Sequence, residues 1–214
     1  MEAHPPRFDP AVLRLIAITD TLRDGIPGLT DRARRAVAGG ATMLQLRLPD
    51  ESPRVLVDAA RALRAAVPEV PLLVNERADV ALAAGAQGVH LNVDGLPPAA
   101  LRRVVPPGFI IGASVGDEPE CGRAVGADYV GIGPVFAAAG GTGSGGAIGL
   151  ARFADLVRRC GIPAVAIGGI STANVRAVMT AGACGIAVIS ALFSSADPTQ
   201  RARDLRAALD ASES

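Results

Sequence analysis

The stretch that decides the fold is "PAVAIGGISTANVRAVMTAGACGIAVIS", residues 163–190. It opens with a short apolar run that ends in Gly168 and Gly169, continues through a segment of helical period, and closes with a second apolar run. Short apolar runs rich in β-branched residues indicate buried strands, and their alternation with helical segments is typical of strand–helix–strand units. Residues 163–190 therefore predict two buried strands joined by a helix.

The same alternation extends along the whole chain. Eight short apolar runs alternate with eight segments of helical period, and the runs lie at 12–19, 41–48, 71–76, 88–92, 109–114, 128–135, 163–169 and 185–190. Continuous apolar runs are expected of parallel strands that are buried on both faces. Eight strand–helix pairs in 214 residues predict one α/β domain, a single (β/α)8 TIM barrel over residues 1–214, with a doubly wound sheet as the competing architecture.

The composition excludes several classes of protein. The chain has 21 basic and 21 acidic residues and a formal net charge of zero, without a sustained basic run, which argues against nucleic-acid binding. All the basic residues are arginines, and Schiff-base chemistry is excluded because it needs a lysine amine. No apolar run is long enough to cross a membrane, and the start of the chain lacks a signal pattern, so we expect a cytoplasmic protein.

Two segments and the cysteines complete the domain description. Residues 1–10 are interpreted as an irregular N-terminal extension, and the glycine-rich segment 137–149 as an active-site lid. Cys121, Cys160 and Cys184 show neither a C-x-x-C pair nor metal-ligand spacing. The odd number of cysteines without such spacing predicts inert, reduced thiols.

In TIM-barrel enzymes the chemistry lies at the carboxyl ends of the strands, and phosphate often binds after strands 7 and 8. The seventh apolar run ends in Gly168 and Gly169, and the eighth ends in Ser190. Glycines allow a phosphate to approach the backbone, and the N–H groups that start the next helix then donate to it. The alternative is that these residues only form tight turns. We predict a phosphate site here.

Polar residues also end other predicted strands. Gln45 and Arg47 are two residues apart, so both point to one side of the second strand, either to bind a ligand or to form a structural ion pair. Asn75 interrupts the third apolar run, and the hydroxyl of Ser114 ends the fifth. His90 in the fourth run is interpreted more readily as a hydrogen-bonded core residue than as a catalyst. These side chains are expected at the barrel mouth.

Two carboxylates follow the third and fourth runs. Glu76 comes directly after Asn75, and Asp94 lies in the loop beyond His90. A pair of carboxylates suits Mg²⁺ that bridges to phosphate oxygens. The alternative role of Asp94 is to cap the following helix. We expect Glu76 and Asp94 to be candidate Mg²⁺ ligands.

Four blocks together resemble the thiamin phosphate synthase and thiazole tautomerase family of barrels. They are "VNERADVALAAGAQGVHL" (74–91), "GADYVGIGPVF" (126–136), "IPAVAIGGISTANV" (162–175) and "GIAVISALF" (185–193). The resemblance implies that Mg²⁺-bound hydroxymethylpyrimidine pyrophosphate loses pyrophosphate, and that the nitrogen of a thiazole phosphate captures the resulting carbocation. It implies small phosphorylated heterocycles as binding partners. Whether the chain forms a homo-oligomer is left open by the sequence.

The resemblance also implies roles for particular residues. It places the thiazole phosphate on Gly168, Gly169, Ile189 and Ser190, and it places Gln45 against the pyrimidine. Arg47, Asn75 and Ser114 match donors to the pyrophosphate. His90 and Thr142 are further candidate substrate contacts, and Glu76 and Asp94 remain the candidate Mg²⁺ ligands.

The chain departs from the family pattern at several positions. Pro49 stands where the family has a lysine, and residues 137–141 stand where it has a lid motif with two hydroxyls and a lysine. Gly95, next to Asp94, takes the place of the second metal aspartate. Two alternatives to a synthase therefore stay open: a tautomerase acting on a thiazole phosphate, whose expected catalytic histidine falls on Gly116, and a non-catalytic paralogue that binds the same phosphates.

Overall fold

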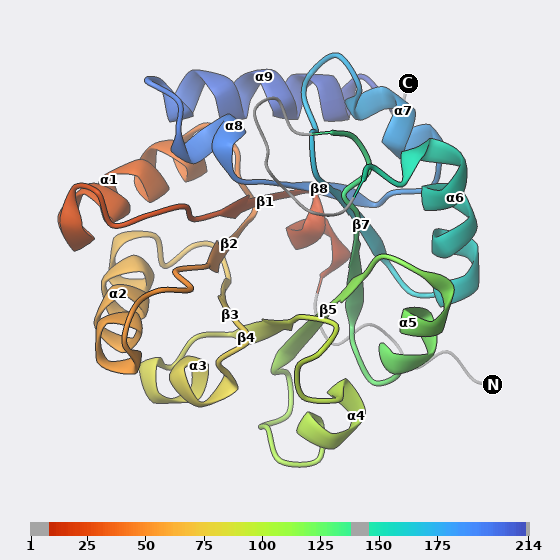
Figure 1. Cartoon of the computed structure of the whole chain (residues 1–214). Helices are drawn as coiled ribbons and strands as arrows, with labels where there is room; N and C mark the ends of the chain where they lie inside the picture. Colours follow the sequence, from red (N-terminus) through yellow and green to blue (C-terminus); the bar gives the residue numbers. More distant parts are fainter. Residues whose placement is uncertain (1–8, 138–145, 213–214) are drawn as a thin grey trace.

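The computed structural model describes residues 9–137 and 146–212, and these residues form a closed parallel barrel (Figure 1). Each strand pairs in parallel with the next, and β8 closes the ring on β1 with Leu15 opposite Ile186. The strands are β1 (Leu15–Ile18), β2 (Met43–Leu46), β3 (Leu72–Asn75), β4 (Gly88–Leu91), β5 (Ile110–Val115), β6 (Tyr129–Ile132), β7 (Ala164–Ile167) and β8 (Gly185–Val188). The predicted (β/α)8 TIM barrel is confirmed.

Helices surround the barrel on the outside (Figure 1). A short 3-10 helix, η1 (Pro10–Leu13), precedes β1. The α-helices are α1 (Gly25–Ala38), α2 (Pro53–Ala66), α3 (Ala78–Ala84), α4 (Pro98–Leu101), α5 (Glu118–Arg123), α6 (Gly149–Cys160), α7 (Val175–Thr180), α8 (Ser190–Phe193) and α9 (Pro198–Asp210). The single turn α8, directly after β8, is an element that the sequence pattern did not indicate.

Local signals explain where several helices begin. Asp197 accepts a hydrogen bond from the backbone N–H of Gln200, which satisfies a free donor in the first turn of α9. Ser171, at the start of the helical segment that follows β7, does not cap α7, because α7 begins after Asn174. The Asn174 side chain instead accepts from the Ser171 N–H and donates to the Gly169 carbonyl, and it thereby holds the loop after β7.

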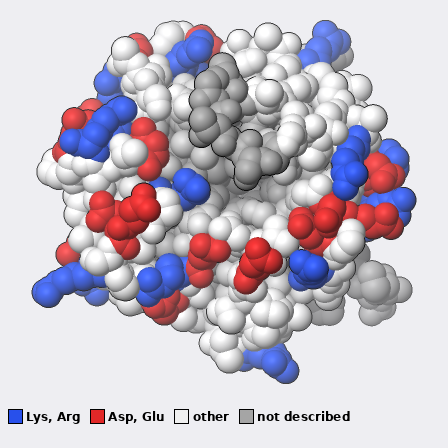
Figure 2. All heavy atoms as spheres, viewed as in Figure 1, with Lys and Arg blue, Asp and Glu red and all other residues white. Residues whose placement is uncertain are grey.

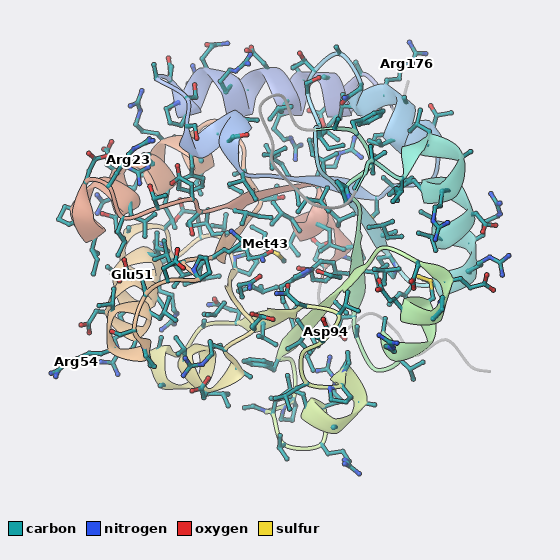
Figure 3. All side chains as sticks on the ribbon, viewed as in Figure 1. Arg23, Met43, Glu51, Arg54, Asp94 and Arg176 are labelled. Atoms are coloured by element: carbon teal, nitrogen blue, oxygen red, sulfur yellow. A yellow bond between two sulfur atoms is a disulfide. The ribbon has the colours of Figure 1, made fainter. Side chains whose placement is uncertain are left out.

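The core has two layers because alternate strand residues face opposite sides of the sheet. Leu15 and Ala17 of β1 pack toward the helices, whereas Ile16 and Ile18 point into the barrel. Met43 joins the inner layer and lies inside the ring of strands in Figure 3. Packed apolar side chains fill the barrel below its mouth, so a ligand can enter only at the carboxyl ends of the strands.

The structure corrects the prediction for two of the cysteines. Cys121 and Cys160 form a disulfide between α5 and α6, with 4.9 Å between the two Cα atoms, whereas Cys184 is free. The partners are 39 residues apart in sequence. Only the packing of consecutive barrel helices brings them together, which is why their spacing gave no signal.

The two predicted irregular segments are only partly covered by the described residues. Within the N-terminal segment 1–10, residues 1–8 lie outside the described part, and Pro10 already begins η1. Of the predicted lid, only Ala137 and residues 146–149 are described, and Gly149 begins α6. Over the described parts of the chain, no helix is long and apolar enough to span a membrane.

Candidate active site

The carboxyl ends of the strands form a mouth that collects most of the polar residues singled out by sequence. A cavity there is lined by apolar residues of β1, β7 and β8 together with Gln45, Arg47, Asn75, His90, Ser114 and Tyr129. The space-filling view shows this face hollowed at its centre, with acidic side chains gathered along one side of the rim (Figure 2). Gln45, Arg47, Asn75, His90 and Ser114, which the sequence placed at the barrel mouth, thus do line it, together with Tyr129.

Two amides are fixed relative to each other across neighbouring strands. The buried Gln45 side chain on β2 donates from Nε2 to Asn75 Oδ1 on β3, at 2.9 Å. Because the Asn75 oxygen is engaged, its NH₂ group is left to donate toward the cavity. The Asn75 NH₂ group can therefore donate a hydrogen bond to an anionic ligand in the cavity.

Arg47 follows β2 and lies on the same side of the strand as Gln45. Its backbone is held by the fully buried Thr19, whose hydroxyl accepts from the Arg47 N–H at 2.8 Å and donates to the Arg47 carbonyl at 3.1 Å. Within 9–137 and 146–212, no carboxylate lies within 4.0 Å of its guanidinium, so the structural ion pair considered from the sequence is not formed. The guanidinium is available to an anion.

His90, Ser114 and Tyr129 form a hydrogen-bonded chain at the base of the mouth. His90 Nδ1 lies 2.9 Å from the Tyr129 hydroxyl, and His90 Nε2 lies 3.1 Å from the Ser114 hydroxyl. Burial lowers the pKa of His90 to about 4 and raises that of Tyr129 above its usual range. His90 is therefore neutral near pH 7, and Tyr129 keeps its hydroxyl hydrogen.

The buried His90 predicts a definite pH dependence of stability. Its pKa is lowered from 6.5 to about 4 in the folded state, so below pH 6.5 the unfolded chain binds a proton that the folded chain rejects. We expect the free energy of unfolding to fall by roughly 3 kcal/mol from this residue between pH 6.5 and 4, and to be unaffected by it at higher pH. Urea unfolding of wild type and His90→Gln across this range measures the difference. Parallel pH profiles would contradict the prediction.

Glu76 has an unusual backbone conformation directly at the end of β3. Its φ of +60° lies in the left-handed region, and it is the only non-glycine residue with positive φ in the described part of the chain. Its N–H donates to the His90 carbonyl at 2.8 Å, and the next N–H, that of Arg77, donates to the Asn75 carbonyl at 2.7 Å. Backbone strain of this kind concentrates at functional sites. The turn places a carboxylate beside the donor Asn75.

Asp94 lies in the loop after β4, at the edge of the mouth (Figure 3). The alternative that it caps α4 is wrong, since Pro97 occupies the N-cap position. No group of three metal-ligating side chains occurs among the described residues. Glu76 and Asp94 therefore fit a Mg²⁺ ion only if water and substrate oxygens supply its other ligands, which is how Mg²⁺ is commonly held at phosphate sites.

The ends of β7 and β8 form a second compartment. Gly168, Gly169, Ile189 and Ser190 line a hollow of about 440 Å³. Gly169 has φ +62°, and a Cβ on it would lie 2.7 Å from the Phe136 carbonyl oxygen. Only glycine fits this close approach of two loops. The predicted phosphate-binding positions are thus brought together.

The two compartments are neighbours. Ile167, Ala187 and Ile189 line both the polar mouth and the glycine-lined hollow. Thr142, the remaining candidate substrate contact, lies outside the described residues.

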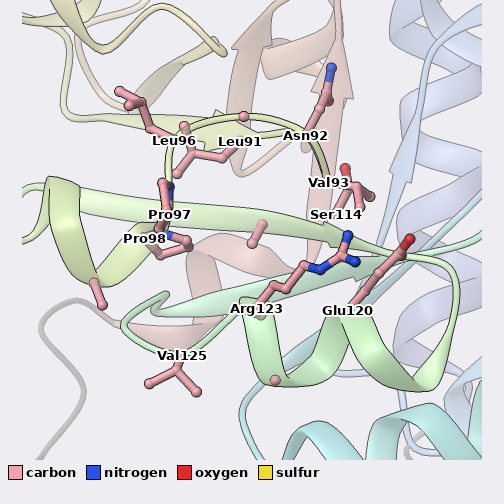
Figure 4. Close-up of a pocket in the computed structure, with 15 residues that line it drawn as sticks. Leu91, Asn92, Val93, Leu96, Pro97, Pro98, Ser114, Glu120, Arg123 and Val125 are labelled. Atoms are coloured by element: carbon pink, nitrogen blue, oxygen red, sulfur yellow. The ribbon is translucent and has the colours of Figure 1, made fainter.

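A third hollow, of about 320 Å³, lies between the loop after β4 and α5 (Figure 4). Its walls are mostly apolar, and Ser114 lines both this hollow and the mouth. Glu120 at its edge caps α5 and accepts from the Gly116 N–H at 2.6 Å. Gly116, the position at which the resemblance led us to expect a tautomerase histidine, instead contributes its backbone N–H to the contacts at the start of α5.

Sequence reasoning missed two residues of this site, Thr19 and Tyr129. Thr19 ends a run that reads as ordinary buried strand, and only the pairing of β1 with β2 reveals that it holds Arg47. Tyr129 is the only tyrosine of the chain and opens an otherwise apolar strand that contains Gly131, a signal that could have been used.

A closed parallel barrel with two adjoining compartments at the carboxyl ends of its strands is the arrangement of TIM-barrel enzymes, whose active sites lie at this face. The family model described as "Thiamine monophosphate synthase" matches residues 15–192, and the chain belongs to this family.

Individual relatives agree with this assignment. The thiamine-phosphate synthase of Azorhizobium caulinodans is 44% identical over 97% of this chain and 99% of its own length. That of Methanoculleus marisnigri is 49% identical over 83% of this chain and 86% of its own. The structure of thiamine phosphate pyrophosphorylase from Pyrococcus furiosus superposes with a TM-score of 0.85 at 35% identity, and it covers 96% of this chain and 99% of its own.

Proposed function

We propose that this chain is a Mg²⁺-dependent thiamine-phosphate synthase that joins hydroxymethylpyrimidine pyrophosphate to a thiazole phosphate and releases pyrophosphate. The observation that supports it is the pair of adjoining compartments, one with polar donors and one lined by glycines, which share three wall residues. A reaction that joins two phosphorylated substrates needs two anion sites that adjoin, so that the reacting carbon of one substrate and the reacting nitrogen of the other can meet. Relatives named thiamine-phosphate synthase match nearly the full chain.

In this proposal each compartment binds one substrate. Backbone N–H groups around Gly168, Gly169 and Ser190 hold the thiazole phosphate, because glycine turns and helix starts present donors to anions. Gln45 faces the pyrimidine ring, and Arg47, Asn75 and Ser114 donate to the pyrophosphate. These contacts align the thiazole nitrogen with the pyrimidine methylene carbon.

The chemistry then depends on stabilising a leaving group. As the carbon–oxygen bond to pyrophosphate breaks, positive charge develops on the pyrimidine methylene, and negative charge on the pyrophosphate oxygens. Donors that are already oriented stabilise this separation of charge without reorganising. The thiazole nitrogen adds to the methylene carbon, and pyrophosphate leaves.

Arg47 is the only charged side chain among the described residues that line the polar mouth. Glu76 and Asp94 would hold the Mg²⁺ ion, which supplies the positive charge that the leaving pyrophosphate needs beyond Arg47. With Pro49 at the family's lysine position, the chain depends on the metal for this charge.

This dependence predicts a sharp response to metal removal. With both substrates and Mg²⁺ the purified protein is expected to form thiamine phosphate and release equal amounts of pyrophosphate. Chelation with EDTA should lower the rate by about 100-fold or more, and excess Mg²⁺ should restore it. A chromatographic assay of thiamine phosphate measures both.

The alternative functions give different results in the same experiment. A protein that binds thiazole phosphate by calorimetry but makes no product would be a non-catalytic paralogue. Metal-independent isomerisation of a thiazole phosphate would indicate a tautomerase. Either result overturns the synthase proposal.

Under this proposal the binding partners of the protein are small phosphorylated heterocycles. We further propose that the reaction takes place in the cytoplasm and that the protein assembles as a homo-oligomer. Cell fractionation and the sedimentation of the purified protein test the last two statements.

A further inference from the structure

His90, Gly112 and Tyr129 lie in one row across three neighbouring strands. His90 of β4 is paired with Gly112 of β5, which in turn is paired with Tyr129 of β6. The glycine in the middle lets the two rings meet, because a Cβ on Gly112 would collide with the Tyr129 ring and lie 2.6 Å from His90 Nδ1. Gly131, paired with Ser114, makes room on the other side, since its Cβ would lie 3.1 Å from His90 Cε1.

The two hydrogen bonds of the His90 ring allow two arrangements of protons. A neutral imidazole has one N–H donor and one acceptor nitrogen. Either the Tyr129 hydroxyl donates to Nδ1 and Nε2–H donates to Ser114, or Ser114 donates to Nε2 and Nδ1–H donates to Tyr129.

Burial decides between these arrangements. Tyr129 is 1% exposed, and in the described residues its hydroxyl contacts no hydrogen-bonding side chain other than His90. In the second arrangement its O–H would be buried without an acceptor, which is costly. In the first arrangement every buried donor is satisfied, and the half-buried Ser114 keeps its own hydroxyl hydrogen free at the mouth.

We propose that Tyr129 is a positioning residue: it donates to His90 Nδ1, fixes the His90 proton on Nε2, and so leaves the Ser114 hydroxyl to donate to the substrate. The substrate part rests on the proposed function and assigns Ser114 as a donor to the pyrophosphate. The proton arrangement itself is a property of the free protein.

The proton arrangement is tested first, without substrate. Two-bond ¹H–¹⁵N spectra of histidine-labelled protein distinguish a protonated from an unprotonated ring nitrogen, and His90→Gln identifies the His90 signals. We expect Nε2 to be protonated and Nδ1 to be a hydrogen-bonded acceptor. In Tyr129→Phe the Nδ1 and Nε2 shifts should move toward each other as the second tautomer becomes populated. A wild-type proton on Nδ1 overturns the proposal.

Kinetics test the consequence for Ser114. Ser114→Ala should lower kcat/KM on the order of 100-fold, as expected for loss of one oriented donor. Tyr129→Phe should lower it by about 5- to 20-fold, chiefly through kcat. If Tyr129 acts through Ser114, the double variant should be no worse than Ser114→Ala alone. Independent, multiplicative losses would overturn the proposal.

A matched control separates positioning from stability. Thr42→Val removes another hydroxyl, which bonds to the Val12 and Leu15 backbone at the opposite end of the barrel. It should lower the stability of the protein while leaving the His90 spectrum and kcat unchanged. If the wild-type protein forms no thiamine phosphate, the proposed function fails, whereas the spectra of the free protein still decide the proton arrangement.

Discussion

Replacing Gly169 by Asp is expected to abolish binding of the thiazole phosphate. The residue has φ +62°, and any Cβ would lie 2.7 Å from the carbonyl oxygens of Phe136 and Ala137. The aspartate would also add a negative charge at the proposed phosphate site, and opposed like charges cost several kcal/mol. We therefore expect affinity for the thiazole phosphate, measured by calorimetry, to fall on the order of 100-fold or more.

Two further variants separate the causes. Gly169→Ala adds the same Cβ without the charge and is expected to have a smaller effect. Gly108→Ala has a comparable positive φ of +81°, but its Cβ would meet nothing within 4 Å, and the residue precedes β5 at the opposite end of the barrel. It should share the backbone strain and keep full affinity. Unchanged affinity in Gly169→Asp would refute the phosphate site.

Glu76→Gln is expected to remove most of the Mg²⁺-dependent activity. The amide keeps the size of the side chain and loses the charge that a divalent ion requires. We expect kcat at saturating substrate to fall by about 100-fold and the Mg²⁺ concentration for half-maximal rate to rise. Glu69→Gln, an exposed carboxylate at the opposite end of the barrel, serves as the control and should leave both unchanged.

A second substitution of Glu76 tests its strained backbone. Glycine adopts φ +60° without steric cost, whereas a residue with a side chain pays about 1–2 kcal/mol there. After allowing for the greater entropy of glycine in the unfolded chain, Glu76→Gly should be more stable by about 0.5–1 kcal/mol and yet inactive. A stable, inactive variant would show that the strain is retained for function. A less stable Glu76→Gly variant would contradict this.

The sequence was sufficient for the architecture because each strand and helix has a strong local signal. The apolar runs that form β7 and β8, with Gly168 and Gly169 after the first of them, already brought together the residues that line the hollow in which we propose that phosphate binds. The polar residues Gln45 and Asn75 were also found, since an amide in an apolar strand is conspicuous.

What the sequence could not provide are the contacts between neighbouring elements and the conformation of one turn. The disulfide between Cys121 and Cys160 depends on how α5 packs against α6. The role of Tyr129 depends on strand register, which aligns it with His90 through Gly112. The left-handed φ of Glu76 reflects a turn between β3 and α3 that no residue type in the turn announces.

The wall shared by Ile167, Ala187 and Ile189 has a consequence for the fidelity of the reaction. A carbocation reacts with whichever nucleophile it meets first, and water is the abundant competitor. These three apolar side chains line both compartments and offer water no hydrogen bonds at the place where, in the proposed reaction, the new carbon–nitrogen bond would form. In the proposed reaction, the proportion of pyrimidine converted to thiamine phosphate rather than hydrolysed is therefore expected to depend on the apolar side chains of this shared wall as well as on the groups that hold the two phosphates.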